Sequence, residues 1–151
     1  IVEFYLDPLI SVVHVCLSIK AYRENTDKIA KDLNITEDRL SKILFKLEKM
    51  KIIKIDKKEI TILINHLSLP KDSNVTVPYQ KLMTQLCAQR KGDLNHEDKK
   101  SFNTVFASTE KTRKKIEFEF SEFIGKVREI VTNSEPGTGV YHLSFDLFPW
   151  T

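Results

Sequence analysis

Cysteine, glycine and proline are all scarce in this chain of 151 residues, and each shortage excludes a class of protein. The two cysteines, Cys16 and Cys87, lie on separate apolar segments and match no metal-binding or secreted disulfide spacing. Four glycines and five prolines, beside 41% hydrophobic residues, exclude collagen-like and disordered chains. We therefore expect a folded protein with small buried thiols, in a reducing cytoplasmic compartment.

Long apolar runs are missing as well. The longest nearly apolar stretch, residues 8–19, is interrupted by Ser11 and His14 and is shorter than the about 20 residues that span a bilayer. The first residues lack the basic segment and the cleavage site of a signal peptide. We expect no membrane partner, and because the chain begins at Ile1 we expect a fragment of a longer protein.

Motifs for catalysis and for metal binding are not found. The four histidines are scattered without the i, i+4 pairing of a metal site, so neither a metal nor another cofactor is predicted. The sequence contains no nucleophile elbow, no phosphate-cradling glycine loop and no HExxH motif. His96, Glu97 and Asp98 are explained by capping and solvation of a polar loop. We expect a protein that is not an enzyme, and we assign no small-molecule effector.

The first half of the chain contains three helical patterns. Asp7 followed by Pro8 is typical of a helix start, with Asp7 as the cap, and predicts a helix over residues 8–20. A second helix, capped by Asn25 or Thr26, is expected to run through about Leu33. Thr36 is expected to cap a third helix, residues 37–50, in which apolar residues recur at i, i+3, i+4 and i+7.

A hairpin pattern follows these helices. Residues 52–55 and 60–64 are rich in isoleucine, and a charged tip that includes Lys57 and Lys58 separates them. Three helices followed by a hairpin are the element order of a winged helix-turn-helix. We predict a winged-helix domain over residues 1–66.

The second half predicts a small helix-and-strand domain, residues 67–151, after a polar linker centred on Pro70. Residues 116–120 alternate like a strand when taken alone, but the length of the surrounding pattern favours a helix. The fold class expected for the whole chain is α+β. The C-terminal elements predicted are a helix over 79–90, a strand over 102–107, a helix over 109–132 and a strand over 140–148.

Basic side chains concentrate on the third helix and on the hairpin. Residues 39–58 contain eight lysines and arginines against two acids, a local net charge of +6 in a chain whose total is +3. This distribution is typical of a winged helix on double-stranded DNA, with the third helix in the major groove and the hairpin tip beside the backbone. The predicted DNA-binding residues are Arg39, Ser41, Lys42, Lys46, Lys49, Lys54, Lys57 and Lys58.

A protein-interaction module is the alternative interpretation. Glu37 and Asp38 occupy the first turn of the third helix, where acids repel phosphates. Phe45 lies nearly opposite the apolar stripe, where an aromatic side chain is exposed unless it meets DNA or a protein surface. Because winged helices also serve as dimerisation and partner-binding modules, the two functions stay open at this point. Phe45 is predicted as an interface residue.

Self-association through the C-terminal half is also expected. Two strands do not form an independently stable sheet, and one long helix covers only one face of them. Phe148 and Trp150 would then be exposed in an isolated monomer. We predict a homodimer with these two aromatic residues at its interface; the alternative is that the first helix, or an N-terminal region that precedes this fragment, shields the surface within one chain.

Two stretches carry a resemblance to a known family: IAKDLNITEDRLSKILFKLEKMKIIK, residues 29–54, and VYHLSFDLFPWT, residues 140–151. Together they resemble an uncharacterised bacterial family of winged-helix transcriptional regulators. Many winged helices share the first stretch, whereas a final strand that closes on Leu-Phe-Pro-x-Thr is more specific. The resemblance implies transcription regulation by a longer cytoplasmic protein with a C-terminal domain of unknown function. It carries over no catalytic residue.

Overall fold

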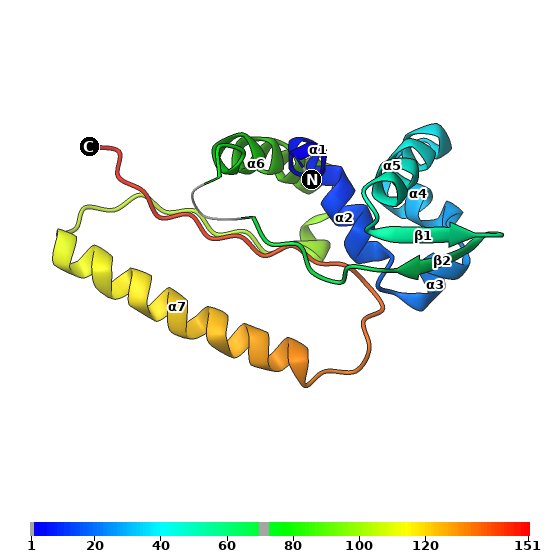
Figure 1. Ribbon diagram of the computed structural model, residues 1–151. Helices are drawn as coiled ribbons and strands as arrows, with labels where there is room; N and C mark the ends of the chain where they lie inside the picture. Colours follow the sequence, from blue (N-terminus) through cyan, green and yellow to red (C-terminus); the bar gives the residue numbers. More distant parts are fainter. Residues whose placement is uncertain (1, 70–72) are drawn as a thin grey trace. The chain divides into compact units, whose positions relative to one another are not determined.

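The computed structural model describes residues 2–69 and 73–151 (Figure 1). The chain is mixed helical with a small two-stranded antiparallel sheet, which is compatible with the expected α+β class. The centre of the predicted linker, including Pro70 and Asp72, lies outside the described residues. In the part of the chain that is described, no helix combines the length and the apolar character needed to cross a membrane.

The chain divides into two compact units. The first contains residues 1–99 and 138–140, and the second contains residues 100–137 and 141–151. The division differs from the domain boundary expected at residue 66, because a further stretch of the chain packs with the N-terminal part.

The first unit begins with three short helices, α1 (Val2–Leu6), α2 (Pro8–Cys16) and α3 (Lys20–Glu24). The single helix predicted over residues 8–20 is wrong, because the helix breaks after Cys16. The guanidinium of Arg23 donates hydrogen bonds of 2.8 and 2.9 Å to two carbonyl oxygens in the break, at Leu17 and Ser18. These local hydrogen bonds satisfy free carbonyls at the helix end and stabilise the turn, which the apolar pattern could not indicate.

The next two helices follow the prediction closely. They are α4 (Asp27–Leu33) and α5 (Glu37–Lys49). The hydroxyl oxygen of Thr36 accepts a 3.1 Å hydrogen bond from the backbone N–H of Arg39, so the predicted cap of α5 is confirmed. Asn34 adopts the left-handed conformation, with φ of 54°, and ends α4.

The predicted hairpin is also confirmed, within two residues at each end. Strands β1 (Ile53–Asp56) and β2 (Glu59–Ile62) pair antiparallel, with Asp56 opposite Glu59. This register leaves Lys57 and Lys58 as a two-residue loop, and both have positive φ, 47° and 74°. Such angles are those of the hairpin turn that usually contains Asn-Gly.

One apolar core fills the first unit. Helix α2 packs against both α5 and α6 (Thr76–Asp93), and α5 also packs against β1 (Figure 1). Burial of about 15 apolar side chains in this way is the main favourable term for the fold. The largest fully buried side chains are Ile10, Val13, Leu17, Ile29, Ile43, Leu47, Ile52 and Ile53.

Helix α6 completes the first unit. It packs against α1 and α2, and the ring of Tyr79 meets that of Tyr5 edge to face with centroids 5.6 Å apart. The helix predicted over residues 79–90 is thus confirmed and begins three residues earlier, but it belongs to the N-terminal unit. A short 3-10 helix, His96–Asp98, follows it.

The second unit contains one long helix, α7 (Glu110–Thr132), as predicted. Thr109 caps it by accepting a 3.2 Å hydrogen bond from the backbone N–H of Thr112. The strands predicted over 102–107 and 140–148 are wrong, since the structure contains no β-ladder there. A period-two pattern states only which side chains share a face, whereas a strand also needs a partner for its backbone groups.

Candidate nucleic-acid interface

The orientation of α5 follows from its apolar spacing. Leu40, Ile43 and Leu47 lie on the inner face and are buried in the core. The opposite face therefore points away from the core and presents Lys42, Phe45 and Lys49. The ring of Phe45 is 67% exposed, at the centre of this outward face.

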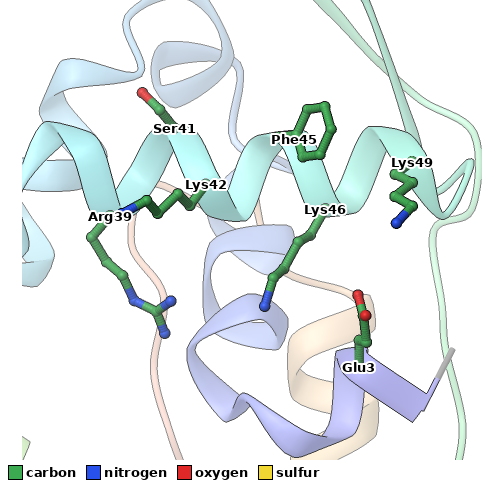
Figure 2. Close-up of a pocket in the computed structure, with 7 residues that line it drawn as sticks. All are labelled: Glu3, Arg39, Ser41, Lys42, Phe45, Lys46 and Lys49. Atoms are coloured by element: carbon green, nitrogen blue, oxygen red, sulfur yellow. The ribbon is translucent and has the colours of Figure 1, made fainter.

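Six of the predicted residues on α5 line one pocket, which has a volume of about 450 Å³ (Figure 2). Glu3 of α1 is the seventh lining residue, and Figure 2 shows its carboxylate on the side to which Arg39 and Lys46 point. Ser41 and Phe45 point the other way. The six residues from α5 are Arg39, Ser41, Lys42, Phe45, Lys46 and Lys49.

Arg39 forms an ion pair with Asp7, which lies 32 residues earlier in the chain. The prediction that Asp7 caps α2 with its side chain is wrong, because its carboxylate makes no capping hydrogen bond there. The Arg39 side chain is 39% exposed and that of Asp7 is 19% exposed. The pair holds the guanidinium toward the body of the unit, on the flank of α5.

Lys42 also has an acidic neighbour. Its ammonium lies 2.7 Å from the carboxylate of Asp38, one helical turn earlier. Both side chains are well exposed, so the pair contributes little to stability and either partner can exchange it for another. Asp38, one of the first-turn acids that argue against DNA binding, therefore neutralises part of the basic face of α5, while Lys46 and Lys49 extend this face toward the C-terminus.

The C-terminal end of α5 is joined firmly to the hairpin. The N–H of Lys51 donates to the carbonyl of Glu48 at 2.8 Å, and that of Ile52 donates to Leu47 at 3.0 Å, as in a Schellman motif. The Glu48 carboxylate accepts a 3.0 Å hydrogen bond from the N–H of Ile55 in β1. Glu48 was absent from the predicted site, because its partner is a backbone group that no charge pattern reveals.

The three lysines predicted on the hairpin lie apart from the pocket. Lys54 projects from β1, and Lys57 and Lys58 form the tip; all three are exposed. The pocket residues that the structure describes come from α1 and α5 alone. The residues predicted to bind DNA thus lie on two surfaces of the first unit.

Phe148 and Trp150 belong to the second unit. Their rings meet edge to face, with centroids 5.4 Å apart, and they are 60% and 78% exposed. Phe45, the other predicted interface residue, belongs to the first unit.

Three titratable groups of the first unit have shifted pKa values. Burial lowers the pKa of His14, whose Nε2 lies 2.8 Å from the carbonyl oxygen of Ile64. Burial raises the pKa of Cys16 to about 11, and the hydrogen bond to Asp32 raises that of Tyr22 to about 12. Among the described residues, no group of histidine, cysteine, aspartate and glutamate side chains could hold a metal ion.

The family of the chain follows from a match over almost its entire length. The model of the family described as Domain of unknown function (DUF4423) matches residues 1–150, and the chain belongs to this family. Comparison with curated proteins and with solved structures gives no match.

Proposed function

We propose that the first unit is a winged helix that binds double-stranded DNA and that the chain is part of a cytoplasmic transcriptional regulator. Helix α5 would enter the major groove, and the hairpin β1–β2 would act as the wing beside the backbone. The observation that carries the proposal is the cluster of exposed lysines on α5 and the hairpin, where residues 39–58 have a net charge of +6.

Three lysines of this surface occupy positions with positive φ, which adds support. Lys51, Lys57 and Lys58 have φ of 58°, 47° and 74°, and such angles favour glycine or asparagine. Local strain of this kind is often associated with a functional requirement for the side chain. Lysine at all three positions is consistent with selection for positive charge beside a polyanion.

Salt-dependent binding to duplex DNA tests this proposal. Changing Lys42 and Lys46 to glutamate should weaken binding to every sequence, because like charge then faces the phosphates. The slope of log affinity against log salt should become shallower by about 2, or about 1 for each lost phosphate contact. Fluorescence anisotropy of labelled duplexes at several salt concentrations measures both quantities.

The matched control is the double change Lys114→Glu and Lys115→Glu on α7, which alters the total charge equally but in the second unit. This control should retain most of the affinity and the full salt slope. Circular dichroism checks that both variants are folded. Equal losses of DNA affinity in the two variants would show that binding depends on overall charge, and would contradict a site on α5.

Partner binding or dimerisation through the second unit is the second candidate function. In this unit, whose residues are all among those described, no side chain is buried, and twelve large hydrophobic side chains are exposed. Apolar surface of this extent marks a protein interface. A homodimer would also present two winged helices to paired DNA half-sites.

A further inference from the structure

We propose that Phe45 reads thymine in the major groove and is a specificity-determining residue of the DNA site. The inference rests on the proposed function, since it identifies what the outward face of α5 meets in DNA. It begins from the position of the ring. Phe45 lies opposite the buried Leu40, Ile43 and Leu47 and is 67% exposed.

The side chains around Phe45 indicate what kind of partner would fit this face of α5. Lys42 and Lys49, one turn on either side, share its face, and Ser41 and Lys46 line the same pocket (Figure 2). A partner for this surface needs negative charge around an apolar spot. An apolar protein surface would desolvate Lys49 without pairing it and would also bury the Lys42–Asp38 ion pair, which is costly.

Duplex DNA meets this requirement. Phosphates border the major groove on both sides, and on its floor the C5-methyl group of thymine offers an apolar contact. If the lysines of α5 engage the phosphates, the ring at the centre of the same face is directed to the bases. Burial of the ring against a methyl group then favours thymine over the other bases at that position.

Replacing thymine by deoxyuracil removes only the methyl group and so tests the contact directly. Duplexes are first enriched from a random pool with the whole chain, and each thymine of the enriched sequence is then replaced in turn. At one or two positions, uracil should weaken binding by about fourfold, as expected for the loss of one buried methyl group. The Phe45→Ala variant should bind more weakly and should bind the thymine and uracil duplexes equally.

Phe118→Ala is the matched control, because Phe118 is similarly exposed, 62%, but lies on α7. It should keep the fourfold preference for thymine. Phe45→Leu should keep part of the preference, since leucine retains an apolar contact. Thermal unfolding followed by circular dichroism verifies that each variant is folded.

The possible failures are distinguishable. Absence of salt-dependent binding to any duplex overturns the proposed function and this inference with it. Tight, salt-dependent binding in which the wild type and Phe45→Ala show the same ratio of thymine to uracil affinity overturns the inference alone. In that case Phe45 would be assigned to a protein surface, as in the dimerisation alternative.

Discussion

Under the proposed function, the ion pair between Asp7 and Arg39 would limit how the basic surface meets DNA. Arg39 is held on the flank of α5, so its use on a phosphate or a base requires release from Asp7. We predict that Asp7→Asn strengthens DNA binding by about threefold, because a partly exposed ion pair contributes at most about 1 kcal/mol. Anisotropy titration at low salt measures the change.

The control for this prediction is Glu97→Gln, which removes one negative charge from an exposed position outside α5. It should change the affinity little. A gain in Glu97→Gln that equals the gain in Asp7→Asn would show that the effect comes from net charge. Unchanged affinity in Asp7→Asn would mean that Arg39 takes no part in binding.

His14 makes the stability of the first unit depend on pH. Burial lowers its pKa below the ordinary value of 6.5, so the unfolded chain binds this proton more readily than the folded chain does. The contribution of neutral His14 to the free energy of unfolding is therefore complete above about pH 6.5 and is lost as the pH falls from there through the lowered pKa. We expect the temperature at the midpoint of thermal unfolding to decrease when the pH is lowered from about 7.5 to about 5.

His14→Gln should flatten this pH dependence, since glutamine can donate to the carbonyl of Ile64 but does not titrate. Its stability at neutral pH is expected to be lower than that of the wild type. The informative quantity is therefore the difference between its midpoint temperatures at the two pH values. His142→Gln, at an exposed position, is the control and should behave as the wild type. The same slope in His14→Gln and the wild type would contradict the assignment.

The hairpin keeps lysines at its tip at a cost in stability. Two non-glycine residues with positive φ cost about 1 kcal/mol each, and Asn-Gly suits this turn better. We predict that Lys57→Asn with Lys58→Gly raises the free energy of unfolding by about 1 kcal/mol, measured by urea denaturation. If the tip touches the DNA backbone, the same variant also shows a shallower salt slope.

Lys57→Gln with Lys58→Gln separates the two effects. It removes the same charges but leaves side chains that are equally strained at positive φ. Its stability should remain near that of the wild type, while its DNA binding should weaken as in the Asn-Gly variant. A stability gain in the glutamine variant would point to relief of charge repulsion rather than of backbone strain.

The second unit lacks a core of its own, and its exposed apolar side chains therefore favour self-association in solution. The ring of Phe120 stacks on that of Phe145 with centroids 3.8 Å apart, yet neither residue is buried. We predict a dimer in sedimentation equilibrium. Changing both Phe148 and Trp150 to serine should weaken it by roughly tenfold to a hundredfold, because two large apolar contacts are lost.

Phe45→Ser provides the control, since Phe45 is exposed to a similar extent but belongs to the first unit. It should leave the dimer intact. A monomer at every accessible concentration of the wild type would contradict the dimer. If dimerisation were weakened in Phe45→Ser alone, the dimer interface would lie on α5, and this face would not be free to bind DNA.

Local pattern was sufficient for much of the fold and of the candidate site. Helices α4, α5 and α7, the cap at Thr36 and the hairpin follow from spacing and capping preferences within a few residues. The basic residues of α5 were predicted to share a surface because helical geometry converts a spacing in sequence directly into a face. Their neighbours along one helix do not depend on the rest of the molecule.

The remaining features were decided by residues far apart in the chain. The packing of α6 against α1 and α2 and the pairing of Arg39 with Asp7 each depend on which surfaces meet. The absent strands belong here too, because residues 102–107 and 140–148 have an alternating pattern but no ladder. Sequence spacing determines which side chains share a face, whereas only the tertiary structure decides what that face contacts, since the contacts compete across the whole chain.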